Sequence, residues 1–133
     1  MNMNAPGAQT VPARVEPYRK IAVIGAGSWG TALASVARTA GRSVTLWGRD
    51  EAVLSAVSRD RANPRYLPDV ELPDGISTTT NLEAAVEGAD AILIVTPSRT
   101  LRDMCRRIAP HLAPEVPVVL CAKGIEAESG LLM

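Results

Sequence analysis

Four short stretches of this chain are apolar at nearly every position, and this pattern constrains the fold more than any other feature. They are the runs 21–24, 44–47, 91–95 and 118–122, with the sequences IAVI, VTLW, AILIV and VVLCA. A strand is apolar throughout when helices cover both faces of a parallel sheet. Segments with helical spacing separate the runs, which is typical of βαβ units. We therefore predict an α/β fold of the Rossmann type, a doubly wound, mostly parallel sheet with helices on both faces. The weaker run 76–80 is predicted to be a strand nearer an edge.

Four helices are predicted between these strands. The first ends before Gly41, where a left-handed glycine commonly follows a helix. Asp50 is predicted to cap the second helix, and Thr80 and Glu83 have the spacing of a capping box for the third. The fourth begins near Ser98. Apolar residues at helical spacing are Trp29, Leu33, Val36, Ala37 and Ala40 in the first helix and Leu101, Met104, Cys105, Ile108 and Leu112 in the fourth.

Length and charge limit the classes of protein to consider. The chain has 133 residues and 47% hydrophobic residues, enough for one domain with a real core. Fourteen basic residues balance 14 acidic ones, so the net charge does not indicate a nucleic acid or a membrane surface as partner. We also expect no metal site. Cys105 and Cys121 lie in apolar segments and are predicted to be core residues in a reducing compartment.

The first 18 residues differ in character from the rest. They hold three prolines and small polar residues, and they lack the apolar region of a signal peptide. We predict a disordered tail at 1–18 and one folded domain at 19–133. No apolar run approaches the length of a membrane span, so a cytoplasmic location is expected.

A glycine-rich turn, GAGSWG, joins the first predicted strand to the first helix. In this βαβ context Gly25 allows the tight turn, Gly27 allows close approach of a pyrophosphate, and Gly30 allows close packing of helix on strand. The free amides around Ser28 and Trp29, together with the helix dipole, favour an anion. The sequence therefore predicts dinucleotide binding and makes 19–133 an NAD(P)-binding domain. A turn kept only for packing is the alternative, but it explains Gly30 and leaves Gly27 without a purpose.

The end of the second strand bears on which dinucleotide is bound. An acidic residue at this place accepts hydrogen bonds from the ribose hydroxyls of NAD. Here Gly48 follows the apolar run and Arg49 comes next, where a guanidinium can pair with a 2′-phosphate. Asp50 comes late for the acid and is assigned to the helix cap. NADP is therefore favoured over NAD, although both remain open, and an ordinary surface charge is the alternative for Arg49.

Several segments together resemble one family of enzymes. In order and spacing, GAGSWGTALA, LWGRD, NPRYLPDVELP, TPS and KGIE are similar to the NAD(P)-dependent glycerol-3-phosphate dehydrogenases, from Lys20 to the end of the chain. The tryptophan after Ser28, the NPRYLP loop and the KGIE segment make the resemblance specific. It implies reversible hydride transfer between NAD(P)H and dihydroxyacetone phosphate, which gives glycerol 3-phosphate for phospholipid synthesis.

The resemblance also assigns residues. It places Ser28, Trp29 and Arg49 at cofactor-contacting positions and Lys123 at a lysine that reaches both cofactor and substrate. Lys123 follows an apolar strand at the sheet edge where such folds bind ligands, and its alternative is a strand-end charge that faces water.

Two further segments receive roles beside these. Pro97 and Ser98, which follow the 91–95 run, are predicted to line the nicotinamide pocket, with a helix N-cap as the alternative for Ser98. Tyr66 and Leu67 are predicted to shape the proline-rich loop 63–75 near the adenosine side, with a plain hydrophobic anchor as the alternative.

One departure from the family is expected to matter. Family members continue with a helical domain that supplies the acid/base lysine and the substrate-phosphate site, and this chain ends before it. We therefore expect a partial dinucleotide-binding domain, inactive in isolation, from an enzyme that forms a homodimer in full-length form. Two alternatives stay open at this point: another Rossmann dehydrogenase of related architecture, and a non-catalytic module that senses dinucleotides.

Overall fold

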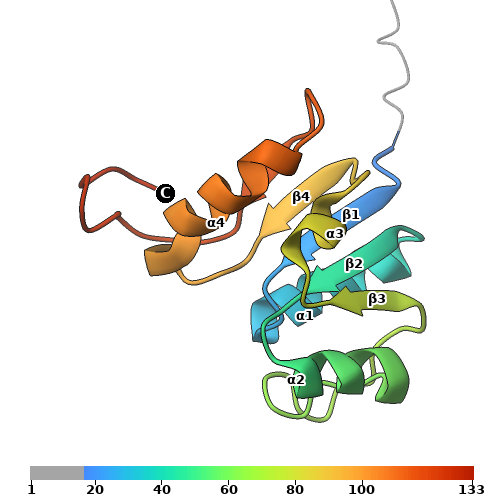
Figure 1. Ribbon diagram of the computed structural model, residues 1–133. Helices are drawn as coiled ribbons and strands as arrows, with labels where there is room; N and C mark the ends of the chain where they lie inside the picture. The colour runs from blue at the N-terminus through green and yellow to red at the C-terminus, as the bar shows by residue number, and fades with distance from the viewer. Residues whose placement is uncertain (1–16) are drawn as a thin grey trace, which may run out of the picture.

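The protein forms a five-stranded parallel sheet, and the computed structural model describes its residues 17–133. All but the last two residues of the predicted tail lie outside this part. The strand order is β3-β2-β1-β4-β5, and every neighbouring pair is parallel (Figure 1). The strands are β1 (Lys20–Ile24), β2 (Ser43–Trp47), β3 (Ile76–Thr79), β4 (Ala91–Ile94) and β5 (Val118–Leu120). The predicted parallel sheet is confirmed, with the weak 76–80 run at one edge.

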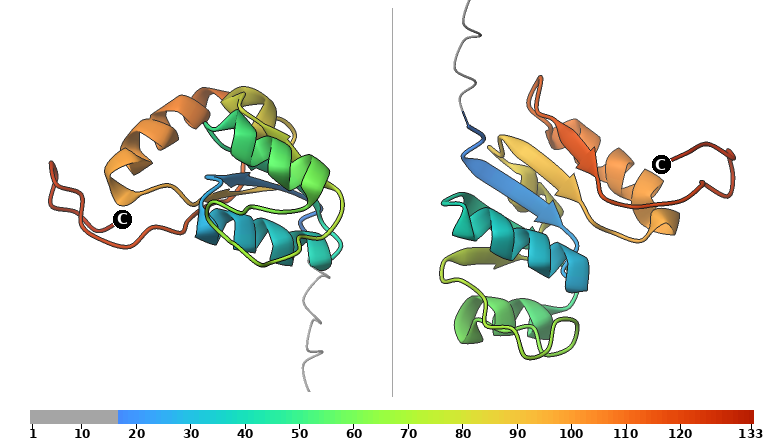
Figure 2. Two further views of the ribbon diagram at one scale, coloured as in Figure 1. Left: turned by 90° about the horizontal axis from the view of Figure 1, so that it is seen from below. Right: turned by 180° about the vertical axis from the view of Figure 1, so that it is seen from behind.

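Helices cover both faces of this sheet. They are α1 (Ser28–Thr39), α2 (Glu51–Ser55) with the π-helical turn η1 (Ala56–Asp60), α3 (Leu82–Val86), and α4 (Leu101–Ile108), which the short 3₁₀ turns η2 (Ser98–Thr100) and η3 (Ala109–His111) flank. Residues of α1, α2 and η1 share one buried cluster with Val23 of β1. Residues of α3 and α4 share the other cluster with Ala22 and Ile24, which point to the opposite face. Figure 2 shows α1 on one side of the sheet and α3 and α4 on the other, so the doubly wound arrangement is confirmed.

The order of the strands creates a crevice at one edge of the sheet. From β1 the chain builds outward through β2 to β3, and it then returns to place β4 and β5 on the other side of β1. Connections therefore leave the carboxyl ends of β1 and β4 in opposite directions, which is where open α/β sheets bind ligands. Within residues 17–133, no helix combines the length and the apolar character that crossing a membrane requires.

The buried face of α1 differs from the prediction. Val36 is 67% exposed and Trp29 is 59% exposed, whereas Gly30, Thr31 and Ala34 are buried. Small residues face the sheet because α1 lies very close to it: a methyl group on Gly30 would lie 1.7 Å from the carbonyl oxygen of Gly25. Large apolar side chains cannot fit at such a contact, so the prediction from apolar spacing was wrong about this face.

The predicted capping box of the third helix is also wrong. Asn81 is the N-cap of α3, and its side chain accepts a hydrogen bond from the backbone N–H of Ala84 at 3.1 Å. The carbonyl oxygen of Thr80 instead accepts a hydrogen bond from the indole of Trp47 at 2.9 Å. Thr80, just after β3, thus contacts Trp47 at the end of β2, and the N-cap lies one residue later than predicted.

Candidate functional site: a pocket around the glycine turn

Two of the three glycines in the turn are required by the packing of the protein, and the third is not. Gly25 has φ +127°, and a methyl group on it would lie 2.6 Å from the carbonyl oxygen of Val95. A side chain at Gly30 is also excluded, because a methyl group there would clash with the carbonyl oxygen of Gly25. Gly27 has φ −74°, which any residue adopts, and a methyl group on it would meet nothing within 4 Å. Packing therefore requires Gly25 and Gly30 but not Gly27, whose missing side chain leaves the floor of a pocket open.

The amino end of α1 supplies hydrogen-bond donors to this pocket. Gly27 is the N-cap of α1 and has no side chain to accept from the first-turn N–H groups. An α-helix leaves these N–H groups without a partner of its own, and the helix dipole adds partial positive charge at this end. Open space over Gly27 beside these donors fits a pyrophosphate.

One pocket brings the predicted cofactor contacts together at the carboxyl edge of the sheet. It includes every predicted cofactor-contacting residue except Lys123 and Ser98, and Ser98 lines a different pocket. Those that line it are Gly25, Gly27, Ser28, Trp29, Gly30, Arg49, Tyr66 and Pro97. They come from the turn after β1, the end of β2, the 63–75 loop and the end of β4. Lys123 is exposed, three residues beyond β5, and it does not line this pocket. Leu67 is half-buried and packs against the core beneath the loop.

The end of β2 and the start of α2 carry three of the charged residues of the pocket, Arg49, Asp50 and Glu51. Asp50 caps α2 as predicted, because its Oδ1 atom accepts from the N–H groups of Ala52 at 2.9 Å and Val53 at 3.3 Å. Gly48 has no room for a side chain, since a methyl group there would lie 2.8 Å from the Cβ atom of Ala26. An acidic side chain therefore cannot stand at position 48. Arg49 lines the pocket and is exposed.

Asn63 is a residue that the sequence analysis missed. It is fully buried at the start of the proline-rich loop, and its side-chain amide donates to the carbonyl oxygen of Ala26 at 3.2 Å and to the hydroxyl of Thr31 at 2.8 Å. Its Oδ1 atom accepts from the N–H of Tyr66 at 3.2 Å. Asn63 therefore joins the loop that carries Tyr66 to the glycine turn. An asparagine before a proline in a polar loop gives no sequence signal for such a role.

Two more residues of the pocket were missed or misplaced. The Thr96 hydroxyl, just beyond β4, is buried without a hydrogen-bond partner among the described residues.

Cys121 was predicted to lie in the core, but it is partly exposed and lines the pocket because β5 ends at Leu120. Cys105 is half-buried and packs against the core cluster of α3 and α4, so its predicted core position is confirmed in part. Burial raises the pKa of both thiols, which keeps them protonated at neutral pH.

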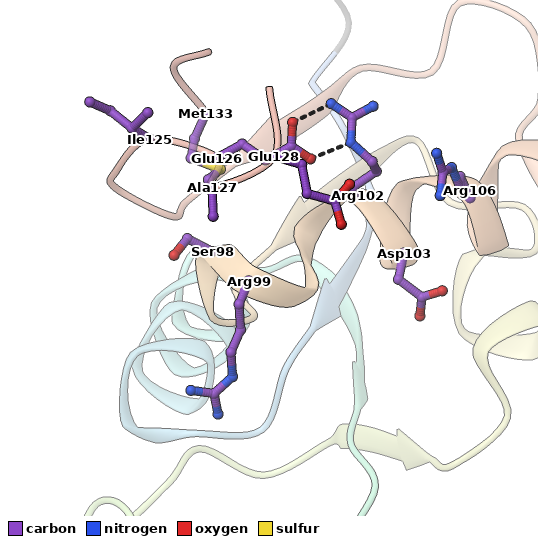
Figure 3. A pocket seen from close by; sticks show the side chains of 10 residues that line it. All are labelled: Ser98, Arg99, Arg102, Asp103, Arg106, Ile125, Glu126, Ala127, Glu128 and Met133. Atoms are coloured by element: carbon purple, nitrogen blue, oxygen red, sulfur yellow. Dashed lines mark hydrogen bonds and ion pairs between the residues drawn. The ribbon is translucent and has the colours of Figure 1, made fainter. Parts of the chain in front are cut away.

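A second pocket lies between α4 and the carboxy-terminal segment (Figure 3). Arg102 pairs with Glu126 through two hydrogen bonds, and Ser129 also donates to Glu126. These contacts lower the pKa of Glu126 to about 2, the hydrogen bonds from Arg102 being the largest cause. The carboxylate of Glu126 thus pairs with Arg102, one of the three arginines that line this pocket, and fastens the carboxy-terminal segment to α4. In the described part of the chain, no cluster of three acidic, histidine or cysteine side chains could hold a metal ion.

The sequence of this chain matches that of a known family of NAD-dependent enzymes. Residues 20–133 match the model of the family described as the N-terminus of NAD-dependent glycerol-3-phosphate dehydrogenase. The chain is 48% identical over 116 residues to glycerol-3-phosphate dehydrogenase [NAD(P)+] from Parvibaculum lavamentivorans, covering 87% of this chain and 34% of that protein. It is 50% identical over 111 residues to the enzyme of that name from Stenotrophomonas maltophilia, covering 84% and 33%. The chain thus spans about a third of the length of these relatives.

A solved structure shows the same arrangement of elements. Glycerol-3-phosphate dehydrogenase from Coxiella burnetii superposes with a TM-score of 0.75 at 34% identity, covering 83% of this chain and 34% of that one. Because the family model matches nearly the whole described part, this chain belongs to the NAD-dependent glycerol-3-phosphate dehydrogenase family, whose amino-terminal portion it matches.

Proposed function

We propose that this chain binds NAD or NADP in the pocket around the glycine turn and serves a glycerol-3-phosphate dehydrogenase. The observation that carries the proposal is the open floor over Gly27 beside the amino end of α1. In this proposal the bound dinucleotide supplies the hydride that interconverts dihydroxyacetone phosphate and glycerol 3-phosphate, the latter feeding phospholipid synthesis. Both relatives reported above are glycerol-3-phosphate dehydrogenases [NAD(P)+] by name, which supports this reaction.

Each side of the pocket has a distinct task in the proposal. Ser28 and Trp29 hold the pyrophosphate at the amino end of α1. Arg49, at the end of β2, takes the adenosine ribose and favours NADP through its charge. Tyr66 walls the adenosine side. Pro97, beyond β4, walls the nicotinamide side, because β4 lies across the crevice from β2.

Lys123 is proposed to contact the cofactor and the substrate. It follows β5 at the carboxyl edge of the sheet, the edge where the other proposed contacts gather. Its ammonium group could there attract the substrate phosphate or polarise the carbonyl oxygen. Action in the cytoplasm, and as a homodimer in the whole protein, is part of the same proposal.

Binding can be followed through a reporter already in the pocket. Trp29 is 59% exposed and lines the pocket, so NADPH should quench its fluorescence on binding. The variant Trp29→Phe, which leaves only the buried Trp47, identifies this part of the signal. Saturable quenching by NADPH or NADH is expected, and its absence with both cofactors would contradict the proposal. In the whole protein, oxidation of NADPH that depends on dihydroxyacetone phosphate would separate a dehydrogenase from a sensing module.

A further inference from the structure

Arg65 lies in the cofactor pocket on a backbone that is fixed before any ligand binds. It stands between Asn63 and Tyr66, in a turn closed by hydrogen bonds from the N–H groups of Tyr66 at 3.3 Å and Leu67 at 2.8 Å to the carbonyl oxygen of Asn63. The buried side chain of Asn63 holds this turn against the glycine turn, at Ala26. The tip that carries Arg65 is therefore tied to the site of the pyrophosphate.

The guanidinium of Arg65 is also held in place. Its Nη1 atom donates to Oδ2 of Asp50 at 2.6 Å, and its central carbon lies 5.1 Å from the centre of the Tyr66 ring. All three side chains line the pocket. The Arg65 side chain nevertheless remains 61% exposed, and a guanidinium carries five N–H donors in a fork, so donors remain for a second anion.

The ion pair also changes what Asp50 can do. Its Oδ1 atom caps α2 and its Oδ2 atom holds Arg65, so both oxygens are engaged within the protein. Arg49, the residue before it, lines the same pocket. Glu51 is the remaining charged residue of the pocket lining, and its carboxylate opposes an anion there. The adenosine end of the pocket thus presents two arginines, with its nearest aspartate occupied.

We propose that Arg65, positioned by Asp50 and Tyr66, is a second ligand of the 2′-phosphate of NADP and sets cofactor choice together with Arg49. This inference rests on the proposed function. A phosphate has three oxygens and accepts from two guanidinium groups at once, whereas NAD offers only a hydroxyl at this place. The contact therefore stabilises bound NADPH and leaves NADH unaffected.

The test is the ratio of NADH and NADPH dissociation constants, measured by titration calorimetry on the chain and three variants. Arg65→Met should weaken NADPH binding by about five- to tenfold and change NADH binding by less than about twofold. The expected loss is that of a charge-assisted hydrogen bond, made smaller because the Arg65 side chain is exposed to solvent. Arg65→Lys keeps the charge without the fork and should fall between. Arg59→Met is the matched control for net charge, because Arg59 is exposed and does not line the pocket, and it should change neither constant.

The other outcomes separate the two proposals. Equal weakening of NADH and NADPH by Arg65→Met would overturn the 2′-phosphate role in favour of a contact to the shared adenosine. No change in either dissociation constant would also overturn the role of Arg65. If the unmodified chain still bound the cofactors, the proposal of dinucleotide binding would stand. Failure of the unmodified chain to bind either cofactor would overturn both proposals. Circular dichroism of each variant establishes that the fold is unchanged.

Discussion

Two glycines of the same turn should respond to alanine in opposite ways. A methyl group on Gly30 would lie 1.7 Å from a backbone oxygen, whereas real Cβ atoms stay beyond 3.0 Å. The backbone of the turn cannot move aside as a flexible side chain would, because Gly25 also contacts Val95. Gly30→Ala should therefore destabilise the fold by about 3 kcal/mol, the upper part of the range for overpacking. The melting temperature should fall by roughly 10 °C or more.

Gly27→Ala should leave the fold intact and weaken cofactor binding. Its φ of −74° suits alanine, and the new methyl group meets no protein atom within 4 Å. Loss of glycine freedom in the unfolded chain offsets the poorer N-cap to within about 1 kcal/mol. The methyl group would instead occupy the space proposed for the pyrophosphate. We expect at least a tenfold loss of NADPH affinity, about 1.4 kcal/mol, and a larger loss for Gly27→Val.

Thermal melting by circular dichroism and NADPH titration, applied to both variants, check this contrast. Gly27→Ala should melt like the parent and bind poorly. Unchanged NADPH affinity in Gly27→Val would refute the assignment of the open floor to a phosphate. A Gly30→Ala variant as stable as the parent would show that the turn relaxes easily, and the distinction between the glycines would then fail.

Three other changes follow from the described contacts. Arg49→Ala should weaken NADPH binding by up to about tenfold and NADH binding less, since the proposed partner of its guanidinium is the 2′-phosphate, which NADH lacks. Equal losses in competitive titrations would make Arg49 an ordinary surface charge. Asn63→Ala should lower stability by about 2–3 kcal/mol in urea melts and also weaken cofactor binding, because three hydrogen bonds of a buried amide disappear; a parent-like melt would contradict this role. The pKa of Glu126 is lowered from 4.5 to about 2, so its contact with Arg102 is complete above pH 4.5 and is lost as the pH falls toward 2. Hydrogen exchange should then show residues 121–133 loosening across that interval, and Glu126→Gln should loosen them already at neutral pH.

The sheet and the glycine turn could be predicted from sequence because local patterns determine them. Consecutive apolar residues indicate a covered strand whatever its neighbours are, and the G-x-G-x-x-G spacing between strand and helix specifies a backbone shape. The face of α1 could not be predicted in this way. The contact between Gly30 and Gly25 selects small residues there, and it depends on how closely helix and sheet approach. Apolar spacing records which residues avoid water and carries no information on that distance.

The proline-rich loop shows why part of the pocket, Arg65 and its anchor Asn63, could not be predicted from the sequence. Its prolines and acidic residues indicate a surface loop, yet hydrogen bonds anchor it at three places, two of them to partners more than 30 residues away in sequence. Asn63 donates to Ala26, the N–H of Leu72 donates to Arg61, and the Nε atom of Arg38 donates to the carbonyl oxygen of Asp74. Prolines lower the entropy lost when such a loop is fixed, and the buried amide then sets its position. The loop is therefore held by these hydrogen bonds although it belongs to no helix or strand, which is the condition that the proposed selective contact to a single phosphate requires.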